Sequence, residues 1–250
     1  MGLFQNKNYP KWLFVFYILF FALTTINVPH LSDFILEHIM TVIFIVLLLS
    51  TYKSFPLSHL SYTFIFIFMI FHTIGAHYTY AEVPYEKWSK ALFGTGINEF
   101  FGFARNHYDR LVHFSFGLFM AYPVREIFLR IANVKGFWGY YLPLDVMAAF
   151  SMVYELIEWG VALIFGGELE MTYLGTQGDI WDAHKDMALA ALGALITMAV
   201  VAFINYIYKP DFKEEIKSSL SVKKITPIGE IELKRVINRK KKREMKHFRL

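Results

Sequence analysis

The stretch GDIWDAHKDMALAALG, residues 178–193, opens a long apolar segment with three carboxylates. Asp179, Asp182 and Asp186 are spaced i, i+3 and i+7, which puts them on one face of a helix with 3.6 residues per turn. A helix over residues 179–208 exceeds the ~20 apolar residues that a bilayer requires. Asp186 would then lie roughly 10 Å below the start of that helix, since each residue rises 1.5 Å. A carboxylate at that depth needs a partner, a metal ion or a water-filled cavity.

Composition indicates the membrane class. Of the 250 residues, 56% are hydrophobic and 18% are aromatic, and they occur in long runs that a soluble domain would not need. The formal net charge is only +4, although the chain has 25 Lys and Arg residues, and these are unevenly distributed. Because the chain has no cysteine, His, Asp and Glu are the side chains available to bind a metal ion.

Six apolar segments are interpreted as transmembrane helices. They cover residues 12–28, 34–50, 61–76, 107–122, 138–165 and 179–208. Pro123 is expected to end or kink the fourth segment, because proline has no backbone N–H to donate. The predicted fold class is therefore all-α: a polytopic membrane helical bundle of six transmembrane helices at residues 1–208, followed by a tail at residues 209–250.

The basic residues predict the orientation of this bundle. Lys and Arg are more numerous beside the N-terminus, in the second-to-third and fourth-to-fifth connections and in residues 209–250. By the positive-inside rule both termini are cytoplasmic, so that residues 209–250 form a basic cytoplasmic tail. We interpret its run KRVINRKKKREMKHFR as an orientation signal attracted to anionic membrane lipids. No nucleic-acid partner is expected, since the run lacks an aromatic platform for stacking bases.

With this topology, the ionisable residues of five segments gather at the outer side of the membrane. They are Asp33 and Glu37, His72 and His77, Asp109 and His113, Glu155 and Glu158, and the three aspartates of residues 179–186. Asp109 and His113 are four residues apart and so share a helix face. His72 and His77 are five apart and point about 140° away from each other on a regular helix. Only one of these two histidines is therefore expected to reach a common site, unless Gly75 breaks the helix.

Such a group is typical of a divalent metal site. Oxygen ligands suit Mg, Mn or Ca, and one or two imidazoles move the preference toward Zn or Fe. Several carboxylates in a low-dielectric pocket raise each other's pKa unless a cation relieves the repulsion. The candidate metal ligands are Asp109, His113, Glu155, Asp179, Asp182, His72 and His77. Glu158 and Asp186 are the candidate catalytic residues, each as a general base.

The same residues also have structural interpretations. The aspartates of the sixth segment could cap its N-terminus and interact with the helix dipole. Asp109 and His113 could form a structural ion pair. Glu155 and Glu158 lie in the middle of a segment, where a purely structural role is least expected.

Four motifs together resemble the YjdF-like family of bacterial inner membrane proteins, a domain of unknown function. They are HTIGAHYTY, NHYDRLVHF, YELIEW and LGTQGDIWDAHKDM, and the resemblance extends from about residue 10 to residue 208. It implies a multi-pass protein of the bacterial inner (plasma) membrane and brings no established activity.

The chain is also similar, more distantly, to the VanZ-like membrane proteins. The matching positions are Asp109 with His113, Glu155, and Asp179 with Asp182. The sequence departs from that pattern in having Glu158 and Asp186 where neutral amides are expected.

Three functions are compatible with these residues. The leading hypothesis is a metal-dependent intramembrane hydrolase or transferase acting at the outer leaflet on a lipid-linked or phosphate-bearing substrate. The alternatives are a proton- or cation-coupled transporter, in which the carboxylates form a relay, and a non-catalytic membrane scaffold. Membrane lipids are the expected partners; the sequence leaves the metal's identity and the oligomeric state open.

Overall fold

The structure is a computed structural model that describes residues 6–165, 177–223, 225 and 227–247, and all regular structure in these residues is helical. The helices are α1 Tyr9–Thr24, α2 Leu31–Thr51, α3 His59–His77, α4 Tyr85–Phe93, α5 Ile97–Phe101, α6 Tyr108–Ile131, α7 Trp138–Phe165, α9 Asp182–Tyr208, α10 Phe212–Ser219 and α11 Ile228–His247. The predicted all-α class is confirmed.

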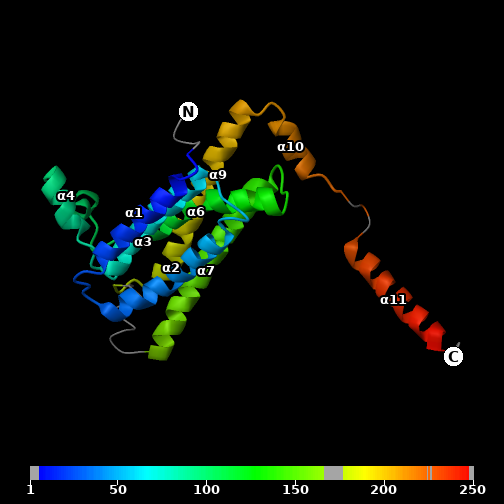
Figure 1. The fold of residues 1–250 in the computed structure, drawn as a ribbon, viewed down its shortest axis with the longest axis horizontal. Helices are drawn as coiled ribbons and strands as arrows, with labels where there is room; N and C mark the ends of the chain where they lie inside the picture. Colours follow the sequence, from blue (N-terminus) through cyan, green and yellow to red (C-terminus); the bar gives the residue numbers. More distant parts are fainter. Residues whose placement is uncertain (1–5, 166–176, 224, 226, 248–250) are drawn as a thin grey trace.

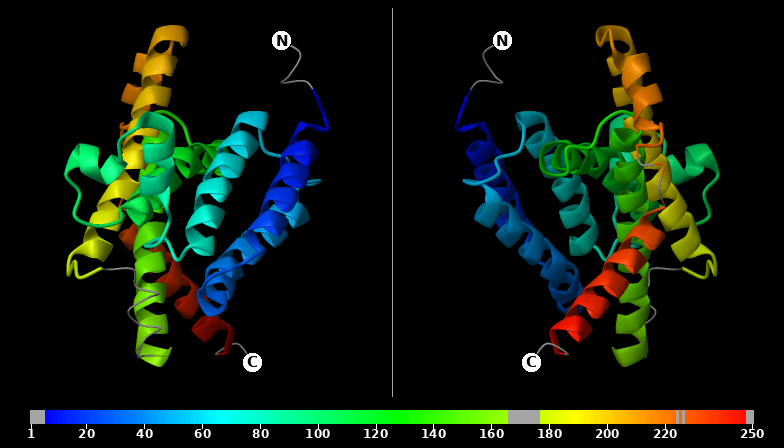
Figure 2. Two further views of the ribbon diagram at one scale, coloured as in Figure 1. Left: turned by 90° about the vertical axis from the view of Figure 1, so that its left-hand side faces the viewer. Right: turned by 90° about the vertical axis from the view of Figure 1, so that its right-hand side faces the viewer.

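The longer helices form one bundle around α6. Helix α6 packs against α3, α7 and α9, while α1 and α2 pack on α3. Figure 2 accordingly shows α3 between α1 on one side and α6 and α9 on the other. The chain segments predicted as spans therefore correspond to α1, α2, α3, α6, α7 and α9.

Four helices in the described part of the chain are long and apolar enough to cross a membrane: α2, α3, α7 and α9. Helix α1 is apolar but has only 16 residues. Helix α6 has 24 residues and carries several charged side chains along its length. The membrane class follows from these helices, whereas the count of six spans and the cytoplasmic position of both termini stay predictions.

Helices α6 and α9 approach closely because both have glycine at the crossing. A Cβ atom added to Gly117 would lie 1.8 Å from the carbonyl oxygen of Ala190, and one added to Gly193 would lie 2.2 Å from that of Phe114. One turn further along α9, the Thr197 hydroxyl donates to the Leu118 carbonyl at 2.5 Å. Small residues thus let the two backbones meet, as is common in membrane bundles.

Methionines from four helices form the middle of the core. Met69, Met120, Met147 and Met198 come from α3, α6, α7 and α9 and are buried together. Met120 lies seven residues beyond His113 on α6, a rise of ~10 Å. An apolar layer therefore separates the polar end of the bundle, described below, from its other end.

Helix α6 does not end at Pro123, and this part of the prediction is wrong. The helix continues through Pro123 to Ile131, although Pro123 can donate no backbone hydrogen bond. Both Ala121 and Pro123 are buried in the bundle, so that tertiary packing holds the helix together across the proline.

The tail begins with a helix that packs on the bundle. Phe212 of α10 contacts the rings of Tyr140 and Tyr206, with centroids 6.2 and 6.0 Å apart. The Trp138 indole N–H donates to the Ser219 carbonyl at 3.0 Å. Helix α11 instead projects away from the bundle, as Figure 1 shows. Residues 209–250 therefore comprise a packed part and a projecting helix.

Candidate metal centre

Three candidate residues converge between α6 and α9. Asp109, His113 and Asp186 each offer one ligand atom, and these atoms lie within 4.8 Å of one another. Asp109 and His113 are one turn apart on α6, with His113 Nε2 at 3.6 Å from Asp109 Oδ1. Asp186 comes from the first turns of α9, which the glycine crossing holds against α6. The three side chains could therefore bind a single ion.

Helix α7 adds two glutamates. His113 Nε2 is 3.5 Å from Glu155 Oε1. Glu158, one turn further along α7, hydrogen-bonds to Glu155 and interacts electrostatically with Asp109 and Asp186. We call these five residues the acidic cluster: Asp109, His113, Glu155, Glu158 and Asp186.

Two buried oxygen atoms of the acidic cluster lack a hydrogen-bond partner among the described residues. They are Glu155 Oε1 and Asp186 Oδ1. Asp186 as a whole is only 2% exposed. Buried carboxylate oxygens without a partner are unfavourable by several kcal/mol or more, unless a proton or cation neutralises them. The chemistry of the cluster therefore fits a divalent cation.

The structure does not bring Asp179 and Asp182 into the acidic cluster, in contrast to their predicted role as metal ligands. Asp182 pairs with Arg105, and its Oδ1 is also 3.1 Å from Arg110 Nη2. Asp179 Oδ2 lies 2.5 Å from both Arg110 Nη2 and Lys185 Nζ. We call this group the arginine layer: Arg105, Arg110, Asp179, Asp182 and Lys185. Two guanidinium groups compete for the oxygens that a metal would need.

The segment before α9 is fixed beside these arginines. Gln177 accepts from the backbone N–H of Asn106 at 3.2 Å and donates to the Asn106 carbonyl at 3.1 Å. Asp179 precedes the first residue of α9, so the predicted helix begins three residues later than expected. Lys185, the Trp181 backbone N–H and Arg110 hold the pKa of Asp179 well below its ordinary value, because they all favour the carboxylate.

Neither His72 nor His77 joins the ligand group, and α3 continues through Gly75 without a break. His77 Nδ1 lies 2.7 Å from the Thr24 carbonyl, which ties α3 to the end of α1. His72 is buried in a separate set of hydrogen bonds. Both positions differ from the prediction that one of these histidines reaches the common site.

His72 belongs to a buried chain of hydrogen bonds that ends on Glu37. Thr41 Oγ1 is 2.8 Å from His72 Nε2, and His72 Nδ1 is 2.7 Å from the Tyr80 hydroxyl. Tyr80 and Tyr154 donate to Glu37 Oε2 at 3.2 and 2.7 Å. We call this set the Glu37 network: Glu37, Thr41, His72, Tyr80 and Tyr154.

The Glu37 network depends on an unusual turn after α3. Thr79 and Tyr80 have φ of 53° and 54°, a region that residues other than glycine rarely adopt. The turn folds Tyr80 back over α3, where a Cβ atom on Gly75 would lie 2.3 Å from its ring. Strain at such positions is typical of functional sites, and each residue costs about 1–3 kcal/mol.

Sequence reasoning missed Arg105, Arg110, Tyr80 and Tyr154 as site residues. The arginines had one usable signal: the predicted topology puts them on the outer side of the membrane, where the positive-inside rule leads one to expect few basic residues. The tyrosines had no such signal, because aromatic residues are abundant throughout the chain.

The fold and the site together define an all-helical integral membrane protein with a buried acidic centre at one end of its bundle. The family model described as "Predicted membrane protein (DUF2238)" matches residues 9–206. Inner membrane protein YjdF of Escherichia coli (strain K12) is 40% identical over 180 residues, which are 72% of this chain and 82% of that protein.

The chain belongs to this DUF2238, YjdF-like family of membrane proteins, as its motifs predicted. It is a multi-pass protein of the inner membrane. No solved structure matches the chain. The VanZ-like resemblance is outside these findings and stays a prediction, and the matching descriptions name a membrane location without an activity.

Proposed function

We propose that the protein is a metal-dependent intramembrane enzyme that hydrolyses or transfers a phosphate-bearing, lipid-linked substrate at the outer leaflet. The observation that carries the proposal is the convergence of Asp109, His113 and Asp186, whose ligand atoms lie within 4.8 Å of one another. The buried oxygens of Asp186 and Glu155 without partners support it, since a cation would satisfy both.

The ligand chemistry narrows the choice of metal. One imidazole nitrogen and several carboxylate oxygens suit Zn, Mn or Mg, and cysteine is absent from the chain. We propose Asp109, His113 and Asp186 as the ligands, with Glu155 completing the set from α7. Asp186 thereby changes from a candidate general base to a candidate ligand.

The remaining residues have complementary roles in a hydrolytic step. The metal would polarise a phosphoryl oxygen and lower the pKa of bound water. Glu158 would accept a proton from the attacking water as the water oxygen bonds to phosphorus and the phosphoester bond to the leaving oxygen breaks, and it would then return that proton to the leaving oxygen. Arg110, whose side chain is 17% exposed and which follows Asp109 on α6, would stabilise the phosphate charge.

The position of the centre supports a substrate that arrives within the lipid. The proposed ligands Asp109, His113 and Asp186 lie within the first two turns of α6 and α9, which start at Tyr108 and Asp182. The surrounding helix surfaces are exposed and apolar, for example at Leu156 and Leu192. A head group anchored by acyl or prenyl chains would reach this level directly from the bilayer.

Phosphate release from reconstituted protein tests the proposal. Vesicles containing phospholipids or a polyprenyl diphosphate would be assayed with Mg, Mn or Zn and with a chelator. We expect metal-dependent release that falls at least 100-fold in Glu158→Gln, with Glu230→Gln on the exposed tail as the matched control. The same slow release with and without metal, or an unaffected Glu158→Gln variant, would contradict the proposal.

The Glu37 network favours a second candidate, a proton-coupled transporter. The Tyr80 hydroxyl donates its one proton to Glu37, so it accepts a hydrogen bond from His72 Nδ1. His72 Nε2 then accepts from the Thr41 hydroxyl, and the three hydrogen bonds form one chain of donors that leads to Glu37. Glu37 is also close enough to Glu158 of the acidic cluster for the two carboxyl groups to repel each other electrostatically. Proton flux into proteoliposomes that disappears in Glu37→Gln would support transport, and no flux above that of empty vesicles would exclude it.

A further inference from the structure

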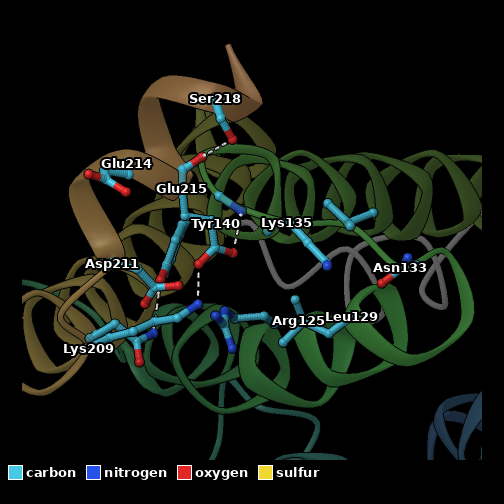
Figure 3. Close-up of a pocket in the computed structure, with 14 residues that line it drawn as sticks. Arg125, Leu129, Asn133, Lys135, Tyr140, Lys209, Asp211, Glu214, Glu215 and Ser218 are labelled. Atoms are coloured by element: carbon cyan, nitrogen blue, oxygen red, sulfur yellow. Dashed lines mark hydrogen bonds and ion pairs between the residues drawn. The ribbon is translucent and has the colours of Figure 1, made fainter. Parts of the chain in front are cut away.

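A cavity lies at the opposite end of the bundle from the acidic cluster. It has a volume of about 750 Å³ and is lined by α6, the α6–α7 connection, α7, α9 and α10. Arg125 lines it from α6, twelve residues or ~18 Å along the helix from His113. Figure 3 shows its lining residues, with polar side chains directed toward one another from several elements.

One ion pair already holds this cavity together. Lys209, just after α9, pairs with Glu215 of α10, and Glu215 also accepts from the Gly136 backbone N–H at 3.0 Å. These two charges neutralise each other and connect α10 to the α6–α7 connection. They are therefore part of the frame of the cavity and are not available to a ligand.

Four further charged side chains lining the cavity form no ion pair with any described residue. Arg125 and Lys135 are the cations, from α6 and the α6–α7 connection, and Asp211 and Glu214 are the anions, just before and within α10. Figure 3 shows the two cations on the α6 side and Glu214 on the α10 side. The cavity thus has a positive wall and a negative wall.

Arg125 is held in place and still has donors to offer. Its guanidinium carbon lies 4.8 Å from the centre of the Tyr140 ring, and Tyr140 in turn accepts from Asn205 at 2.8 Å. Its Nε is buried without a hydrogen-bond partner among the described residues. A planar guanidinium fixed in this way is well suited to bind a phosphate group.

Exposed aromatic residues surround this end of the bundle. Trp138 and Tyr141 are 42% and 39% exposed at the start of α7, and Tyr206 and Tyr208 are 53% and 80% exposed at the end of α9. Trp and Tyr concentrate where the lipid head groups meet water. The cavity therefore lies at the depth of the lipid head groups.

We propose that this cavity binds a phosphate linked to a primary ammonium group, as in the head group of phosphatidylethanolamine. Arg125 and Lys135 bind the phosphate, and Asp211 and Glu214 bind the ammonium. A cavity of about 750 Å³ is in the ordinary range of ligand sites, roughly 300–1,000 Å³.

The acidic wall selects the head group. Carboxylates accept hydrogen bonds from a primary ammonium, which has three N–H donors to offer. A quaternary choline has no N–H and is typically bound by free aromatic faces, but the guanidinium of Arg125 already covers the ring of Tyr140. Phosphatidylglycerol lacks the cation that Asp211 and Glu214 require, so its affinity is expected to be lower.

Native mass spectrometry of the full chain tests the proposal directly. The detergent-purified protein would be exposed to equal amounts of phosphatidylethanolamine, phosphatidylcholine and phosphatidylglycerol. We expect one phosphatidylethanolamine molecule to be retained at least 10-fold more than the other two. Lys135→Gln, an exposed position, should lower that retention ~10-fold, as should Arg125→Gln. Lys217→Gln on α10, outside the cavity, is the matched control and should have no effect.

The acidic wall provides an independent readout. The double variant Asp211→Asn, Glu214→Gln should reverse the preference and favour phosphatidylglycerol, a gain that unfolding could not produce. If soluble phosphoethanolamine at equal concentration displaces phosphatidylethanolamine, the result would support the site and would identify the free head group as its ligand. Equal retention of the three lipids in the wild type, or an unchanged preference in the Lys135 and double variants, would overturn the proposal.

Discussion

At the scale of single residues, His113 determines what the acidic cluster can do. Its Nε2 is 3.6 Å from Asp109 and 3.5 Å from Glu155, so one nitrogen faces two carboxylates. Asp186 completes the group from α9. A metal ion at this point would replace the repulsion among these acids with attraction, and its loss would expose that repulsion.

The substitution Glu155→Gln should have opposite effects on the stability of the metal-free protein and on its activity. The amide removes a buried charge that has an oxygen without a partner, so the metal-free variant should be more stable than the metal-free wild type by about 1 kcal/mol or more. Phosphate release should fall ~100-fold. Thermal unfolding with and without chelator checks the first part; lower stability of the metal-free variant would contradict it.

The lowered pKa of Asp179, in the arginine layer, predicts that the stability of the protein depends on pH. Lys185, the Trp181 backbone N–H and Arg110 lower its pKa in the folded protein, whereas the unfolded value is about 3.9. The ion pairs of Asp179 therefore stabilise the fold fully above pH ~4, and the contribution is lost as the pH falls through the folded pKa.

The measurement is the difference in melting temperature between the wild type and Asp179→Asn from pH 3 to pH 8. We expect a constant difference between pH 5 and pH 8 that shrinks below pH 4. A difference that grows on acidification would show that the carboxylate is not the stabilising form.

The sequence predicted part of this site for clear physical reasons. Asp109 with His113 and Glu155 with Glu158 lie within one helical turn, so their common faces follow from spacing alone. Asp179 was assigned to the same face as Asp186, but it lies in the turn before α9, where helical spacing does not apply. The pairing of Asp182 with Arg105 joins residues 77 apart in the chain, and local periodicity carries no information on such pairs.

At the scale of elements, the crossing of α6 and α9 fixes the acidic cluster. Gly117 and Gly193 let these helices touch, and His113 and Asp186 lie one to two turns from that contact. The small residues Ala190, Gly193 and Thr197 of α9 are buried. A wider crossing would move the ligands of α9 away from those of α6.

Gly193→Ala should therefore destabilise the protein. Its Cβ would lie 2.2 Å from the Phe114 carbonyl oxygen, and overpacking of this kind costs about 1–3 kcal/mol. Gly160→Ala on α7 is the matched control, since nothing lies within 4 Å of its added Cβ. The control should be neutral or more stable by up to ~1 kcal/mol. Equal effects of both substitutions on the unfolding temperature would contradict the close crossing.

The elements that the sequence predicted least well are those decided by packing. Apart from the end of α6, apolar length located the long helices to within a few residues, because the period and the flanking polar residues are local signals. Pro123 was expected to end or kink the fourth segment, but α6 continues through it, because burial in the bundle outweighs the lost hydrogen bond. The prediction assigned α10 to the basic tail outside the bundle, because its anchors Gly136, Phe137 and Trp138 are distant in sequence.

At the scale of the whole molecule, the bundle has two chemically different ends. One end holds the acidic cluster and the arginine layer, and the other holds the cavity of Figure 3 beside α10. The apolar layer of buried methionines, which are Met69, Met120, Met147 and Met198, lies between these two ends. The predicted orientation puts the acidic end outside and the cavity inside.

Single cysteines test this orientation cleanly, because the chain contains none. Lys87→Cys, in α4, should react in intact cells with a maleimide that cannot cross membranes. Asn6→Cys and Val222→Cys should react only after permeabilisation, since an even number of spans puts both on the cytoplasmic side. Labelling of both Asn6→Cys and Val222→Cys in intact cells would show the opposite orientation, and labelling of only one of them would show an odd number of spans.

Elemental analysis of the purified protein tests the central claim most directly. With Zn, Mg or Mn supplied, the wild type should retain about one divalent ion per chain, and Asp186→Asn should lose it while Asp211→Asn, at the other end of the bundle, keeps it. A folded wild-type protein that retains no ion, or an Asp186→Asn variant that retains as much as the wild type, would contradict the metal centre.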